Sequence, residues 1–311
     1  MPSIDRTTII TGPAKITYGG QSFWSKGNVT LVPVNSRFKI PTAHFGDVDE
    51  RYSSRQYTVN FEPAGRFTSA LAAVLFPHAA LSIGASIFGA SDAALVINSR
   101  DGKSYTIHNA AVTKMPVIRA SVGKTIFGPV TFTGLLKNST DPSNAAAYMT
   151  VATTTYPGDT GFAVSDILTK AYASAWGADP WDEFLTEDGW EISIDMQLRE
   201  QIVDGLGVVD MTLQNMTVSA KCVPVGVTDA AILAKLTPAA ALGTSVAAAA
   251  ANLIVSATGV YFAVYNAALV DSGLAFGSES KRISATEWVA TRTVTTGLAD
   301  PLFYVSTAAP A

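Results

Sequence analysis

The sequence predicts a mainly β protein that contains two tandem copies of one unit, with one short helix in each copy. Three observations lead to this fold class. Short segments of alternating apolar and polar residues recur along the chain, turn signals separate them, and Gly and Pro recur at a fixed offset between the two halves. With 311 residues, the chain also has the length of two domains of about 150 residues each.

The internal repeat is the strongest pattern in the sequence. One gap-free block recurs at an offset of 161 residues, and a later block recurs at an offset of 157. Because Gly and Pro each meet a specific backbone requirement, their joint recurrence indicates a duplication. The matched pairs are Gly46 with Gly207, Pro63 with Pro224, Gly65 with Gly226, Pro77 with Pro238, Gly102 with Gly259, and Asn109 with Asn266. We expect a first copy over residues 1–136, a linker over 137–165 and a second copy over 166–311.

Alternating segments predict the strands of each copy. In the first copy they cover residues 14–18 and 56–61, and in the second copy they cover 192–198 and 217–222. The dipeptide Asp101-Gly102 predicts a tight hairpin between two further strands. Each copy is therefore expected to form a half-buried sheet with one apolar and one polar face.

A short helix is expected after the strand at 56–61 in the first copy and after the strand at 217–222 in the second. Thr68 and Thr228 are suitable N-caps, since each precedes apolar residues at helical spacing. Pro77 and Pro238 follow and end these helices, because Pro cannot donate the backbone hydrogen bond of a helix interior.

A long connection joins two strands in each copy, at residues 35–55 in the first and 199–214 in the second. Adjacent strands are usually joined by roughly two to five residues. We therefore expect two long loops that contact neighbouring molecules. The residues assigned to these contacts are Lys39, His44, Asp47, Asp49, Glu50, Arg51, Arg199, Glu200, Asp204 and Asp210.

The composition excludes several function classes. Charged residues make up 15% of the chain, against roughly 25% in an average domain, which indicates a surface covered by neighbouring subunits. A net charge of −4 gives no attraction for nucleic acid or anionic membranes. The single cysteine, Cys222, excludes an internal disulfide. Neither a signal peptide nor an apolar membrane span is recognisable, so we expect a cytoplasmic product without a membrane partner.

No constellation of catalytic or metal-ligating residues stands out, and we expect neither enzyme activity nor a metal or cofactor. His44, His78 and His108 lie far apart in three different sequence contexts. An acidic segment with three tryptophans, at 176–190, leaves a carbohydrate-binding site open as an alternative to a solvated acidic loop.

Motifs in the first copy resemble a known family. This copy opens with Gly12-Pro-Ala-Lys-Ile-Thr-Tyr-Gly-Gly20, its long connection ends in Phe45-Gly-Asp-Val-Asp-Glu50, and it enters the helix through Phe61-Glu-Pro-Ala-Gly65. These motifs and the order of elements resemble the tail tube, or major tail, proteins of long-tailed bacteriophages. The likeness is specific over residues 11–77. The second copy shares the order of elements but departs from the opening motif.

The resemblance implies β-sandwich or barrel units whose sheets join edge to edge into a ring of six units. Stacked rings would form the hollow tube of a phage tail, through which DNA passes without specific binding. Two fused copies would make this ring from three chains, a pseudo-hexamer. The implied partners are further copies of the chain and the tape-measure, tail-terminator and tail-tip proteins, in a virion assembled in the host cytoplasm.

The polar strand faces are the candidate lining of that lumen. A neutral or acidic lining would let DNA pass without phosphate contacts that slow it. Lys221 shares this face and departs from the rule, and a plain solvent-facing surface is the alternative interpretation. The residues assigned to the lining are Thr30, Gln56, Thr58, Asn60, Glu191, Ser193, Asp195, Thr217 and Ser219.

Two further function classes stay open. Another virion component, such as a capsid decoration or tail-end protein, would form a ring or trimer but no long tube. A carbohydrate-binding module would bind sugar as a monomer.

Overall fold

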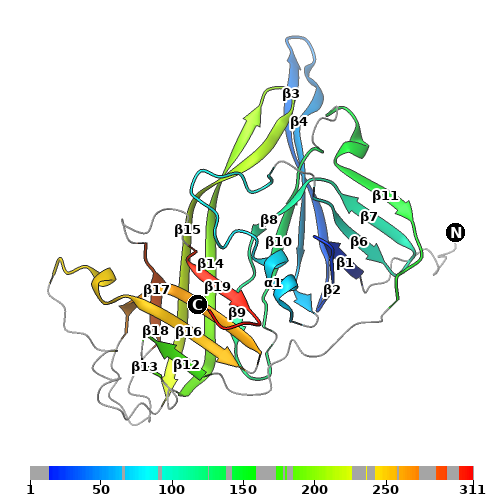
Figure 1. The fold of residues 1–311 in the computed structure, drawn as a ribbon. Helices are drawn as coiled ribbons and strands as arrows, with labels where there is room; N and C mark the ends of the chain where they lie inside the picture. Colours follow the sequence, from blue (N-terminus) through cyan, green and yellow to red (C-terminus); the bar gives the residue numbers. More distant parts are fainter. Residues whose placement is uncertain are drawn as a thin grey trace, which may run out of the picture.

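Three antiparallel β-sheets make up the fold (Figure 1). The computed structural model describes residues 14–64, 67–89, 93–124, 126–137, 142–158, 173–177, 179–180, 185–225, 236, 242–257, 259–272, 285–292 and 301–310. The prediction of a mainly β fold is confirmed.

Sheets A and B are built from the first half of the chain. Sheet A has the strand order β11 (Met149–Thr153), β7 (Lys103–Ile107), β6 (Leu95–Ser99), β1 (Ala14–Tyr18), β2 (Gln21–Ser25) and β5 (Pro63–Ala64). Sheet B has the order β3 (Thr30–Thr42), β4 (Gly46–Phe61), β10 (Val130–Gly134) and β8 (Ala110–Lys114).

Sheet C is built from the second half of the chain and one strand of the first. Its order is β13 (Asp179–Pro180), β12 (Ala173–Trp176), β16 (Ala251–Ala257), β17 (Val260–Asp271), β18 (Thr286–Ala290), β15 (Gly207–Val225), β14 (Leu185–Val203) and β9 (Ile118–Ala120). A further strand, β19 (Phe303–Ser306), pairs with β17.

The predicted helix of the first copy is α1 (Ser69–Leu75). The Thr68 hydroxyl accepts a hydrogen bond from the Leu71 amide at 3.1 Å, which satisfies one of the free N–H groups at the helix start. Two short 3₁₀ helices also occur, at Ala145–Ala147 and Val246–Ala249. No helix in the described ranges combines the length and apolar character that crossing a bilayer requires. The helix expected after Thr228 falls almost wholly outside the described residues.

The two long connections are β-hairpins, and the prediction of loops there was wrong. Strands β3 and β4 stay paired from Thr30 opposite Asn60 to Thr42 opposite Gly46. Strands β14 and β15 stay paired as far as Val203 opposite Gly207. Both faces of the first outer hairpin are largely exposed, so no alternation of apolar and polar residues marks its strands in the sequence. In the second, β15 buries Val208, Met211 and Leu213, and a register shift between the first two interrupts the alternation.

The stretch expected as a linker contains β11, which pairs with β7 from Met149 opposite Ile107 to Thr153 opposite Lys103. The Asp101-Gly102 hairpin is confirmed, with Ser99 opposite Lys103.

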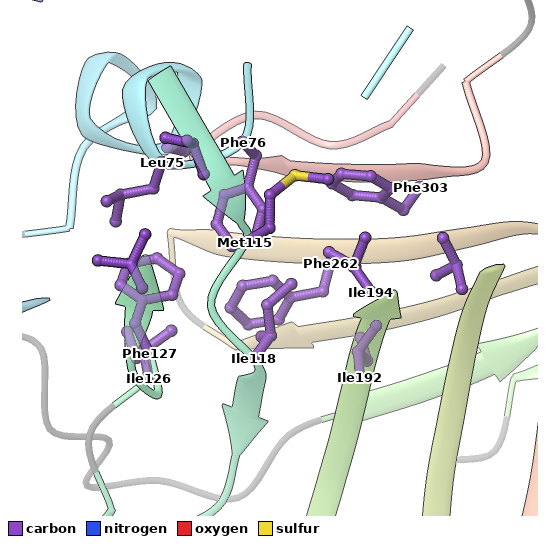
Figure 2. Close-up of a cluster of buried hydrophobic side chains, with 14 of the residues drawn as sticks. Leu75, Phe76, Met115, Ile118, Ile126, Phe127, Ile192, Ile194, Phe262 and Phe303 are labelled. Carbon is purple, nitrogen blue, oxygen red and sulfur yellow. The ribbon is translucent and has the colours of Figure 1, made fainter. Parts of the chain in front are cut away.

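A shared core holds the two halves together (Figure 2). The segment around β9 carries Met115, Ile118 and Phe127, each at most 3% exposed, against strands of sheet C. Strand β9 pairs directly with β14, with Ile118 opposite Ile192. Phe67 links the halves further, because its ring lies 5.7 Å from Phe127 and 6.2 Å from Phe262 between centroids.

Two titratable side chains are buried in the core. Burial raises the pKa of the Cys222 thiol to about 12, so this cysteine is an inert core residue, as its strand position predicts. His78 is 5% exposed, and its Nε2 lies 2.8 Å from the Val112 carbonyl oxygen, to which it donates. Burial lowers the pKa of His78, although the hydrogen bond opposes this shift.

We predict that His78 makes the protein less stable as the pH falls below 6.5, its ordinary pKa. The unfolded chain then binds a proton that the folded chain resists, so the free energy of unfolding falls by up to about 1.4 kcal/mol per pH unit. Urea unfolding between about pH 5.5 and 7.5 measures this slope, a range above the ordinary carboxyl pKa values. His78→Gln, which keeps an N–H donor, should flatten the slope. If the free energy of unfolding of this variant depends equally steeply on pH, other titratable groups cause the pH dependence.

Candidate assembly surfaces

Two hairpin arms extend from the sheets. The first arm is the outer part of β3 and β4, residues 35–55, and the second arm is the outer part of β14 and β15, residues 199–214. Both arms point toward the top of Figure 1, where the first reaches beyond the rest of the chain. In the first arm the backbone hydrogen bonds join its own two strands, so this arm can project into solvent without unpaired groups inside the hairpin. In the second arm β15 also bonds to the segment at 84–87, because the Ile87 amide donates to the Met211 carbonyl oxygen and the Leu213 amide to the Ala85 carbonyl oxygen, both at 3.0 Å.

The first arm brings together most of the residues predicted to contact a neighbour. Ion pairs join Lys39 to Asp47 at 2.6 Å and Arg37 to Glu50 at 3.2 Å. Arg51 pairs with Asp49 at 3.5 Å, and His44 lies in the turn beside Phe45. These pairs are exposed and contribute little stability, but they cancel most of the charge along the arm.

Large apolar side chains are exposed along both arms. Phe45 is 82% exposed at the tip of the first arm, and Ile202 is 70% exposed on the second. The other exposed apolar residues of the arms are Phe38, Val48, Tyr52, Val203 and Leu206. An apolar surface of this extent, with internally paired charges around it, is typical of a protein–protein contact.

The second arm leans against the base of the first. Gln56 donates to the Glu200 carboxylate at 3.0 Å, so Glu200 faces the other hairpin. Gly207 lies so close to Ser54 that a Cβ added there would meet the Ser54 Cα at 2.9 Å. Ser86 donates to Asp210 at 2.7 Å, which turns this predicted contact residue toward the chain itself. Arg199 and Asp204 are exposed.

The predicted lining residues of the first half lie on one face of sheet B. The register places Thr30 opposite Asn60, and Asn60 opposite Thr131 on the next strand. Thr131 donates to the Asn60 side chain at 2.6 Å. The next strand places the exposed Lys114 opposite Thr131. In the rows beyond, Val32 lies opposite Thr58 and Val34 opposite Gln56, so these rows are uncharged and partly apolar.

The predicted lining residues of the second half lie on the corresponding face of sheet C. One row across four strands reads Arg119, Glu191, Lys221 and Glu287, with alternating charge. Lys221 pairs with Glu287 at 3.3 Å, and this pairing accounts for the exception noted in the sequence. The rows beyond place Ser193 opposite Ser219 and Asp195 opposite Thr217.

The two halves share the same strand neighbours. Strand β3 pairs with β4 and β4 with β10 in the first half, as β14 pairs with β15 and β15 with β18 in the second. The other sheets repeat this order, because β1 pairs with β6, β6 with β7 and β7 with β11, as β12 pairs with β16, β16 with β17 and β17 with β19.

An unusual backbone conformation also recurs. Asn109 and Asn266 have φ angles of 42° and 46°, and every other described residue with positive φ is Gly. The carbonyl oxygen of Asn109 accepts from the Leu135 amide at 3.1 Å, and that of Asn266 accepts from the Thr291 amide at 3.0 Å. Asn tolerates this left-handed conformation better than other residues with a side chain, which explains the same choice at both positions.

Sites for small-molecule chemistry are not apparent in the described ranges. They hold no group of three or more His, Cys, Asp or Glu placed to bind a metal ion. Trp176 and Trp190 are 8% and 3% exposed and pack around Trp288, so neither offers the open ring that stacks on a sugar. Trp181 lies outside the described residues.

Sequence reasoning missed the pairing of β9 with β14 and the row of alternating charge that it creates. Residues 118–120 form a strand of only three residues, too short for a periodic signal. A comparison with protein-family models and a comparison with curated proteins find no match for this chain.

We predict that the turn glycines Gly46 and Gly207 differ in their sensitivity to substitution, although both have positive φ. Gly46→Ala should lower the free energy of unfolding by about 1–2 kcal/mol, the cost of a side chain in this conformation. Gly207→Ala should cost about 1–3 kcal/mol more, because its Cβ collides with Ser54. Urea denaturation of both variants measures the difference. Equal losses would show that the contact between the arms adds no stability.

Proposed function

We propose that this chain is a structural subunit of a bacteriophage tail tube, with no catalytic role. In this proposal, copies of the chain form rings that stack into a hollow tube through which DNA passes. The observation that carries it is the shared order of strand neighbours in the two halves, together with the resemblance of the first copy to tail tube proteins.

The shared strand neighbours support a duplication of one structural unit. Unrelated β units would agree in the number of strands more easily than in which strand pairs with which. The paired positive φ angles of Asn109 and Asn266 agree with this origin. Two copies of one unit in a chain give two successive positions in a ring, so three chains supply six positions.

The arms supply a contact suited to stacking. They extend from the sheets and expose Phe45 and Ile202, and ion pairs match most of the charges of the first arm. A neighbouring ring that covers these apolar side chains would gain free energy without leaving unpaired charges buried.

The polar faces of sheets B and C suit a lumen for DNA. Thr30, Asn60 and Thr131 form an uncharged stretch, and Glu191, Lys221 and Glu287 form the corresponding charged row. The only lysine of this row is paired with Glu287, so the face offers phosphate groups no free cation there.

We predict that the purified protein assembles into tubes at high concentration. Negative-stain electron microscopy after size-exclusion chromatography should show hollow tubes of uniform width, with three chains in each ring. Rings or trimers without tubes would favour another virion component. A monomer at every concentration and salt would contradict self-assembly.

We also predict that the exposed apolar side chains of the arms drive stacking. The double variant Phe45→Ser with Ile202→Ser should raise the concentration needed for tubes by about tenfold or more, since large apolar anchors dominate such contacts. Rings should still form. Val151→Ser, at a position 55% exposed on β11, is the matched control. Tubes that form equally well from the double variant would exclude the arms from stacking.

A further inference from the structure

One edge of sheet B lacks a partner that sheet C has. In sheet C, β9 covers the outer edge of β14. In sheet B, β3 is the outermost strand, and no strand of the described ranges pairs with its outer edge. Strands β3 and β14 hold the same place in the two halves, because each is the first strand of a long hairpin whose second strand continues the sheet.

The register identifies which residues correspond. Trp190 lies opposite Cys222 and Ile192 opposite Ala220. Leu31 lies opposite Val59, the counterpart of Ala220 at the 161-residue offset. The positions that β9 covers, 190–192, therefore correspond to residues 29–31 of the uncovered edge.

The two edges differ in what lies against them. A Cβ on Gly189 would overlap the backbone of Ala120, the last residue of β9. Gly27, one residue before the counterpart of Gly189, has no atom within 4 Å of its own added Cβ. Ile192 is 1% exposed, whereas its counterpart Leu31 is only half-buried. The contacts that close the second half are thus missing from the first.

A groove occupies the corresponding place in the first half. It has a volume of about 640 Å³ and is lined by Gly27, Val29, Leu31, Ile97 and Tyr105, among others. The counterpart of Tyr105 at the 157-residue offset is Phe262, which is fully buried and contacts the Phe67 ring of the first half. The groove therefore matches the surface that the β9 segment and Phe67 cover on sheet C.

We infer that the outer edge of β3 at residues 29–31, with this groove, accepts a strand from a second copy of this chain. The added strand pairs with β3 as β9 pairs with β14 within the chain. This inference rests on the proposed ring assembly and specifies its contact between chains. At the 157-residue offset the counterpart of β9 is residues 275–277, which lie outside the described residues.

Each chain then has one joint within itself and one between itself and the next chain. An acceptor edge on the first half and a donor on the second are different surfaces, so the contact is head-to-tail and closes into a ring. Strand addition also satisfies the free backbone groups of an exposed sheet edge, which otherwise favour uncontrolled pairing.

The test fills the groove without disturbing the subunit. Gly27→Leu places a side chain where the folded chain leaves open space at an ordinary φ angle. It should leave the melting temperature unchanged and raise the concentration for half-maximal ring assembly by about tenfold or more, as overpacking of a close contact does. Ala146→Leu adds similar bulk at an exposed position outside the groove and is the control. Asn28→Arg, at an exposed groove position, is a second variant with the same expected loss.

Hydrogen exchange identifies the occupant. Outward-facing amides at residues 29–31 should exchange fast in the free subunit and become protected on assembly. Protection already in the free subunit would mean that the chain covers its own edge, and would overturn the inference. Assembly of Gly27→Leu and Asn28→Arg at wild-type concentrations would overturn it while leaving the tube proposal standing. A wild-type protein that forms no ring at all would overturn the proposed function, and this inference with it.

Discussion

The pairing of β9 with β14 is the constraint on which the arrangement of the two halves depends. It places a three-residue strand of the first half at the edge of a sheet built otherwise from the second. Met115, Ile118 and Phe127 are thereby buried against sheet C, and Phe67 reaches Phe262 across the same boundary. Separating the halves would expose this apolar surface and leave the edge of β14 without its partner. The two halves therefore share one core and one sheet, and they are not separate domains joined by a linker.

The same pairing determines which sheet edge is covered and which stays exposed. Sheet C is closed at β14, whereas sheet B ends in β3 with an open groove beside it. The arms extend both hairpins beyond the core. They expose the apolar side chains of Phe45 and Ile202, and ion pairs match most of the charges of the first arm. In the proposed assembly, the open edge serves the lateral contact and the arms serve the axial contact.

Sequence patterns predicted those parts of the fold in which local chemistry and burial agree. The alternation of residues 56–61, the Asp101-Gly102 turn and the Thr68 cap each became the element expected. The polar faces also assembled as predicted, because residues two apart on a strand share a face whatever the sheet around them. The first arm was missed because strands exposed on both faces carry no apolar period, and the second because a register shift interrupts the alternation of its buried residues. The charge matching between Lys221 and Glu287 depends on which strands become neighbours.

By itself, the sequence determined the β class, the helix cap and the faces of the central strands, and it predicted a repeat. Each of these depends on residues close together in the chain or on a comparison of the chain with itself. Only the tertiary structure decided that β9 leaves its own half, that β11 completes sheet A, and that Trp176 and Trp190 are core residues. These outcomes depend on contacts between residues distant in sequence, where the gain from burying apolar surface and pairing sheet edges outweighs local preference.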